Sequence, residues 1–212
     1  MRLYLSSMGF GNHPEKIALL VGNGRRAAVI CNAMDYQDTE ERFSIVKHEI
    51  TGLVMLGFMP QEIDLRNYFG KSEELKHVLM AYDFLWVSGG NTFLLRRAFK
   101  QSGLDALLPE LLAHDQIVYG GYSAGACILS PSLKGIDLVD PADEVVVGYD
   151  KKIIWDGLHV IDYAIAPHYK SGLYSDYIDG IVQYFVDHHM HFKTLRDGEV
   201  IIIDGEQESF VS

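Results

Sequence analysis

Cysteine is scarce in this chain: only Cys31 and Cys127 occur among 212 residues, and neither lies in a C-x-x-C pair or a metal-finger spacing. This excludes a disulfide framework and a zinc-finger module, and it fits a reducing compartment. Long apolar runs are missing too: no stretch approaches the ~18 consecutive apolar residues of a membrane span, and no signal peptide is visible. We therefore expect a cytoplasmic protein without a membrane partner.

Basic residues are outnumbered, because 18 Lys and Arg against 29 Asp and Glu give a net charge of −11. This charge repels phosphate backbones, so nucleic acid is not an expected partner. An anionic substrate would need a local basic residue. Apolar residues make up 48% of the chain and charged residues 22%, which are ordinary globular values. The length predicts one α/β domain over residues 1–212 and leaves the oligomeric state open, a homodimer included.

Short apolar runs alternate with segments of helical periodicity along the chain. Such alternation with short loops predicts a mostly parallel sheet covered by helices on both faces. The expected strands are Leu3–Ser6, Ala27–Cys31, Gln61–Leu65, Phe84–Val87, Ile117–Tyr119, Val145–Val147, Ile153–Trp155, Tyr163–Ala166 and Val200–Ile203, and the expected helices are Pro14–Val21, Glu40–Leu56, Thr92–Lys100, Asp105–His114, Ala126–Leu129 and Tyr174–His188.

The motif Gly121-Tyr122-Ser123-Ala124-Gly125 is the strongest chemical signal, because it stands between an apolar strand and a helical segment. A G-x-S-x-G in this context is typical of a nucleophile elbow, in which small flanking residues permit a tight turn that exposes the serine. The alternative is a glycine-rich structural turn with an incidental serine. The flanking strand and helix favour catalysis.

A nucleophilic serine needs a base, and His168 is the best placed of the nine histidines. It follows an apolar strand, so it is expected at the carboxyl edge of the sheet, where open α/β folds place their sites. His159 precedes its strand and is expected at the opposite end. His188, His189 and His191 cluster near a helix terminus without the i, i+4 spacing of a helical zinc site.

A second glycine turn, Ser88-Gly89-Gly90-Asn91-Thr92, follows the strand Phe84–Val87. Backbone amides of Gly89 and Gly90, together with that of Ala124, could donate to a developing oxyanion. The same turn can equally be a strand-to-helix connection in which Asn91 or Thr92 caps the helix. Both interpretations can hold together.

In this order, Gly89-Gly90-Asn91-Thr92, Gly121 to Ala126 and Pro167-His168-Tyr169 resemble the motifs of the peptidase E (aspartyl dipeptidase) family of serine peptidases. The resemblance spans most of the chain. It implies a class I glutamine-amidotransferase-like fold, a flavodoxin-like three-layer sandwich. It also implies Ser123 as nucleophile, His168 as base, the amides of Gly89, Gly90 and Ala124 as oxyanion donors, and hydrolysis without a metal or other cofactor. Asn91, Tyr122 and Lys170 are then the expected substrate-binding residues.

The acidic partner of the base is left open by the sequence. Asp137 lies nearest the aspartate of the resembled family and is our first choice, with Asp140, Asp143, Glu144 and Asp162 as rivals. Any of them could be a solvated loop charge. Cys127 is expected to be a small core residue rather than the cysteine nucleophile of an amidotransferase.

The segment after His168 differs from the resembled family, in which an arginine soon after this motif grips the substrate's aspartate. Here Lys170 to Asp179 holds no arginine but two aspartates, Asp176 and Asp179, that would repel an acidic side chain. Lys170 could supply only a point charge. The sequence thus predicts a peptidase of a small peptide or amide without firm aspartyl specificity. An esterase, a cyanophycin-type peptidase of acidic polymers and a non-catalytic ligand-binding homologue remain as alternatives.

Overall fold

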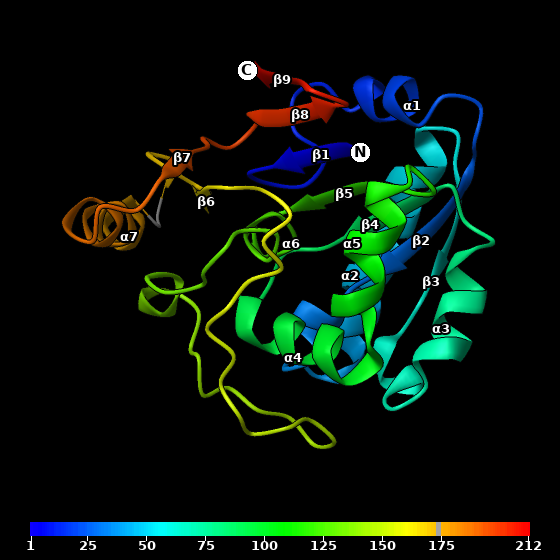
Figure 1. Cartoon of the computed structure of the whole chain (residues 1–212), viewed down its shortest axis with the longest axis horizontal. Coiled ribbons are helices and arrows are strands. Elements are labelled where there is room, and N and C mark those ends of the chain that lie inside the picture. The colour runs from blue at the N-terminus through cyan, green and yellow to red at the C-terminus, as the bar shows by residue number, and fades with distance from the viewer. Residues whose placement is uncertain (173–174) are drawn as a thin grey trace.

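A seven-stranded sheet forms the centre of the fold, in the order β3-β2-β4-β5-β1-β8-β9. The computed structural model describes residues 1–172 and 175–212. Strands β3, β2, β4, β5 and β1 run parallel, and β8 and β9 add two antiparallel strands at one edge (Figure 1). The strands are β1 (Arg2–Ser6), β2 (Arg26–Ile30), β3 (Met59–Glu62), β4 (Phe84–Val87), β5 (Val118–Tyr122), β8 (Val200–Asp204) and β9 (Gln207–Val211).

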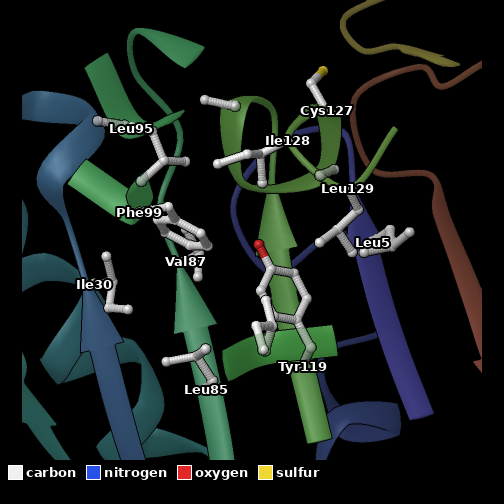
Figure 2. Packing of buried hydrophobic residues seen from close by; sticks show 14 of the residues in the cluster. Leu5, Ile30, Leu85, Val87, Leu95, Phe99, Tyr119, Cys127, Ile128 and Leu129 are labelled. Atoms are coloured by element: carbon white, nitrogen blue, oxygen red, sulfur yellow. The ribbon is translucent and has the colours of Figure 1, made fainter. Parts of the chain in front are cut away.

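Helices cover both faces of the sheet and enclose two apolar clusters. The helices are α1 (Glu15–Val21), α2 (Thr39–Met55), α3 (Ser72–Leu79), α4 (Thr92–Ser102), α5 (Leu104–Ala113), α6 (Ala124–Cys127) and α7 (Ser175–Asp187), with 3-10 helices at Asn32–Met34, Leu65–Tyr68 and Ile136–Leu138. Neighbouring strand residues alternate between the faces, so Leu3 and Leu5 pack with α4 and α5 while Tyr4 packs with α1 and α2. Figure 2 shows the first cluster, where Leu85, Val87 and Tyr119 of the strands meet Leu95 and Phe99 of α4. The predicted α/β fold with a mostly parallel, doubly covered sheet is confirmed.

A second sheet of two parallel strands lies beside α7, away from the main sheet (Figure 1). It consists of β6 (Ala164–Ala166) and β7 (Phe192–Thr194), and the sequence analysis missed β7. It also missed α3 and β9. The predicted helix Tyr174–His188 corresponds to α7, and Tyr174 lies outside the described residues.

The predicted strands Val145–Val147 and Ile153–Trp155 are wrong, because both belong to a long irregular segment, residues 139–158. This segment runs past α4 before it returns to β6 (Figure 1). Buried Arg97 of α4 donates hydrogen bonds to the carbonyl oxygens of Ala142, Glu144 and Lys152. The side chain of Arg97 therefore satisfies backbone groups that a sheet would otherwise pair.

No helix in the described part of the chain is long and apolar enough to cross a membrane.

Candidate active site

Ser123 occupies the sharp turn between β5 and α6, with backbone angles φ 49° and ψ −114°. A positive φ at a residue other than glycine is strained and is typical of functional turns. The turn needs glycine at its second flank, because a Cβ on Gly125 would lie 2.3 Å from the Val87 carbonyl oxygen. The Ser123 amide donates to the Ser6 carbonyl at 3.2 Å, which ties the turn to the end of β1. This is the geometry of a nucleophile elbow.

His168 reaches the serine, as the sequence analysis expected. Its Nε2 lies 3.1 Å from Ser123 Oγ, and its Nδ1 lies 2.7 Å from Asp197 Oδ1. His168 follows β6 and Asp197 follows β7, so the parallel pairing of these two strands brings both side chains to one edge. Ser123, His168 and Asp197 thus form a continuous chain of polar contacts.

Ser7, at the end of β1, holds the histidine and the aspartate together. Its fully buried hydroxyl accepts a hydrogen bond from the His168 amide at 2.8 Å. The same oxygen lies 2.9 Å from Asp197 Oδ1 and 3.2 Å from the Leu195 carbonyl, to either of which it can donate. The Asp197 amide in turn donates to Ser171 Oγ at 2.8 Å. Sequence reasoning missed both Ser7 and Asp197.

Asp137, the predicted partner of the histidine, does not contact it. Its Oδ1 instead accepts a hydrogen bond from the Gly135 amide at 2.9 Å, within the turn that leads into the 3-10 helix Ile136–Leu138. This bond holds the Asp137 side chain within its own turn. Of the rivals, Asp143 and Asp162 are exposed. Asp140 and Glu144 line the cavity described below, but neither is the carboxylate on Nδ1.

The second glycine turn lies against the elbow. A Cβ on Gly89 would lie 2.7 Å from a ring carbon of Tyr122 and 3.2 Å from Ser123 Cβ, so only glycine permits this approach. Gly90, at φ 131°, lines the same cavity as Ser123, and Ala124 follows Ser123 as the first residue of α6. Asn91 caps α4 as the alternative interpretation foresaw: its Oδ1 accepts from the Leu94 amide and its Nδ2 donates to the Pro141 carbonyl. Its side-chain amide is therefore already engaged in the fold.

Tyr122 is anchored from below by a buried carboxyl group. Its hydroxyl donates to Glu49 Oε1 at 2.8 Å, and the indole of Trp86 donates to Glu49 Oε2 at 2.7 Å. Burial raises the pKa of Tyr122 well above its ordinary value, and the neighbouring Glu49 raises it further. Tyr122 is therefore neutral, and its ring forms part of the cavity wall.

A cavity of about 950 Å³ opens on Ser123, His168 and Asp197. Met8, Met34 and Ile178 contribute apolar wall, and Gly89, Gly90 and Asn91 contribute the second turn. Lys170, which the sequence analysis expected to bind substrate, does not line the cavity. It is exposed, and its ammonium lies 5.1 Å from the centre of the Tyr169 ring. Asp176 and Asp179 are exposed on α7 and do not line the cavity either.

The two cysteines are buried and unpaired, and Cys127 packs in the core with its thiol directed at the Ile165 carbonyl. Burial raises the pKa of the Cys127 thiol, which keeps it protonated and unreactive. Within residues 1–172 and 175–212, no group of three or more His, Cys, Asp or Glu side chains is arranged to hold a metal ion.

An α/β sheet that presents a serine elbow to a histidine and an aspartate defines the class of serine-type hydrolases. Within that class the chain belongs to peptidase family S51, whose family model matches residues 12–211.

Two similar proteins are uncharacterized peptidases of Listeria. Lmo0363 of Listeria monocytogenes is 30% identical over 155 residues, which are 73% of this chain and 72% of that protein. Lin0382 of Listeria innocua is 31% identical over 160 residues, covering 70% of this chain and 71% of that protein.

A crystal structure from Listeria monocytogenes EGD-e, named provisionally as a peptidase E protein, matches with a TM-score of 0.82. The two share 26% identity, and the match covers 99% of this chain and 97% of that chain. A peptidase from an acI-B1 actinobacterium matches at TM-score 0.70 and 13% identity over 100% of this chain and 87% of its own. At that identity the likeness supports the fold alone.

Proposed function

We propose that this peptidase cleaves a small peptide or amide through an acyl-enzyme on Ser123. The observation that carries the proposal is the contact chain from Ser123 Oγ to His168 Nε2 at 3.1 Å and from His168 Nδ1 to Asp197 Oδ1 at 2.7 Å. Its order and lengths suit proton transfer between hydroxyl and imidazole.

In the first step, Ser123 Oγ attacks the substrate carbonyl carbon while His168 Nε2 takes the hydroxyl proton. Asp197 holds the imidazole with its proton on Nδ1 and stabilises the imidazolium that forms. The negative charge on the carbonyl oxygen is met by backbone amides of the two turns, for which Gly90 and Ala124 are our candidates. Gly89 packs closely on the Tyr122 ring and on Ser123 Cβ, so we assign it chiefly to close packing.

In the second step, the bond from carbon to nitrogen breaks as His168 returns its proton to the leaving amine. Water then attacks the acyl-enzyme with His168 again as base, which releases the acid and restores the serine. Every proton in this cycle passes through His168, so the proposed reaction needs no metal.

The experiment that tests this proposal is the labelling of Ser123 by a fluorophosphonate probe, followed by mass spectrometry of the labelled peptide. We expect labelling of the native protein and none of Ser123→Ala, together with a loss of turnover of about 10³-fold or more in that variant. Equal turnover by Ser123→Ala would overturn the assignment. A panel that pairs amides with the matching esters separates a peptidase from an esterase.

A further inference from the structure

Two carboxyl groups that the proposed reaction does not use face the cavity. Asp140 and Glu144 both line it, on the wall formed by the 139–158 segment. Within the part of the chain that the structure describes, neither acid forms a salt bridge with Lys or Arg, and His168 is the basic side chain whose charge acts on Asp140. The cavity also contains Ser123 and His168, so these acids belong to the same site as the proposed nucleophile.

Asp140 lies beside the turn that carries the proposed oxyanion donors. Its Oδ2 accepts a hydrogen bond from the Thr92 amide at 2.8 Å, and Thr92 is two residues beyond Gly90. Burial raises the pKa of Asp140, while Thr92 and, more weakly, His168 oppose the rise. A carboxylate that is costly to desolvate gains from a cationic ligand that arrives beside it.

Glu144 is half-buried on the same wall, and its backbone carbonyl is held by Arg97. Arg97 Nη1 donates to the Glu144 carbonyl at 3.1 Å and Arg97 Nη2 to the Ala142 carbonyl at 2.6 Å. Burial is the main cause that raises the pKa of Tyr36, another lining residue, and the charges of Asp140 and Glu144 add to it. Both acids therefore act on one region of the cavity.

Basic side chains do not offset these acids. Among the described residues, the cavity is lined by no lysine or arginine, and His168 is its single basic side chain. The guanidinium of Arg97 is turned toward backbone carbonyls. An aspartate side chain entering this cavity would meet uncompensated negative charge, whereas an ammonium or guanidinium group would find two acceptors.

We propose that the cavity selects peptides or amides whose acyl half carries a positive charge, and that Asp140 and Glu144 bind this charge. The inference rests on the proposed function for its definition of the acyl half. The charge has two chemical sources, the free α-amino group of an N-terminal residue or a lysine or arginine side chain. Both present N–H donors that carboxylates bind.

Binding is measured by titration calorimetry on Ser123→Ala, in which no ligand is consumed. The ligands are leucinamide, N-acetyl-leucinamide, N-acetyl-lysinamide and the α-amide of N-acetyl-aspartate. We expect leucinamide or N-acetyl-lysinamide to bind at least about 10-fold more tightly than N-acetyl-leucinamide, and the aspartyl amide to bind most weakly. Preference for leucinamide identifies the α-amino group as the source, and preference for N-acetyl-lysinamide identifies the side chain.

Variants of the two acids test their assignment in the same background. Asp140→Asn and Glu144→Gln should each weaken binding of the preferred cation by about 10-fold. Asp143→Asn is the matched control, because Asp143 is an exposed neighbour outside the cavity, and it should change binding less than about twofold. If Asp140→Asn fails to fold, Glu144→Lys serves instead, and it should reverse the preference toward the aspartyl amide.

The inference is overturned if the aspartyl or the neutral acetylated amide binds as tightly as both cationic ligands, or if the acid variants match the control. Fluorophosphonate labelling of native Ser123 is a separate measurement. If Ser123 is not labelled but cationic ligands bind selectively, the proposed function is refuted and the charge preference stands. If Ser123 is labelled but cationic ligands are not preferred, the charge preference is refuted and the proposed function stands.

Discussion

Asp197 is bound to its surroundings more firmly than its exposure suggests. Its side chain is 36% exposed, yet Oδ1 is shared between the His168 imidazole and the Ser7 hydroxyl. The Asp197 amide is held by Ser171. Ser7 also binds the His168 amide, so one buried hydroxyl fixes the distance between the histidine and the aspartate. This arrangement favours one orientation of the imidazole, with Nδ1 protonated and Nε2 directed at Ser123.

Replacing Asp197 tests that orientation. Asp197→Asn should lower kcat by about 10² to 10⁴-fold, because an amide can donate to Nδ1 and stabilise the wrong tautomer. Asp137→Asn should keep kcat within about threefold, since Asp137 is exposed and bonds only within its own turn. Steady-state kinetics on the best amide substrate measures both. A larger loss in Asp137→Asn than in Asp197→Asn would contradict the contact chain.

Sequence patterns predicted Ser123 and His168 as site residues but not Asp197, and the reason lies in the sequence around each residue. Ser123 sits in a motif whose flanking glycines are required by close packing, and His168 follows an apolar strand. Asp197 follows β7, Phe192–Thr194, a strand of three half-buried residues without an apolar run to mark it. Had that strand been recognised as a parallel partner of β6, the first acid past its end would have been Asp197. Ser7 carries no pattern of its own.

At the scale of elements, α2 supports the elbow from beneath the sheet. Glu49 projects from α2, is 2% exposed, and accepts hydrogen bonds from Trp86 of β4 and Tyr122 of β5. The Tyr122 ring packs on Gly89, and Tyr122 is the residue directly before Ser123 in the chain. Glu49 therefore sets the positions of both turns through a single aromatic ring.

Glu49→Gln should destabilise the fold by about 1–3 kcal/mol, because one of two buried donors loses its acceptor. The same change should slow fluorophosphonate labelling of Ser123, since Tyr122 is then less firmly held. Urea unfolding measures the first effect and labelling kinetics the second. Glu40→Gln, at an exposed position in the first turn of the same helix, is the control; it should change the free energy of unfolding by less than about 1 kcal/mol and leave the labelling rate unchanged. Unaltered labelling in a destabilised Glu49→Gln protein would limit Glu49 to a role in folding.

Elements with strong local signals were predictable, and elements defined by tertiary contacts were not. The strand Phe84–Val87 is fully buried and the helix after it has an asparagine cap, so its boundaries follow from the sequence. Val145, Val146, Ile153 and Trp155 do pack against the core, which explains the apolar pattern that suggested strands. The backbone carbonyls beside these residues, at Ala142, Glu144 and Lys152, accept hydrogen bonds from Arg97, a side chain distant in sequence that periodicity cannot reveal.

For the whole molecule, a cluster of charged side chains joins the ends of β2 and β3 to α2 and to the 139–158 segment. Asn32 donates to Asp35 Oδ2 at 2.7 Å and to Asp64 Oδ1 at 3.0 Å. Arg66 Nη2 pairs with Asp64 Oδ2 at 2.6 Å, and Tyr149 of the segment donates to Asp35. The segment that carries Asp140 and Glu144 is thus anchored to the sheet by groups far from it in sequence.

This cluster predicts that the free energy of unfolding falls as the pH is lowered, because it contains Asp64. Burial alone would raise the pKa of Asp64, but hydrogen bonds from Arg66 and Asn32 outweigh it, and the net pKa is lowered. Because Asp64 binds a proton less readily in the folded state than in the unfolded state, its stabilisation is present above the ordinary aspartate pKa of about 3.9. It is lost as pH falls through the lower folded value.

Asp64→Asn should therefore lower the free energy of unfolding by about 1 kcal/mol at pH 7, a small figure because the site is partly solvated. The difference in free energy between the variant and the native protein should shrink toward pH 3. Urea unfolding of both proteins across this range measures the difference, with Glu73→Gln at an exposed position of α3 as the control for loss of one charge. A difference that grows on acidification would mean that Asp64 is easier to protonate in the folded state, and the cluster would then not be an anchor of the kind described.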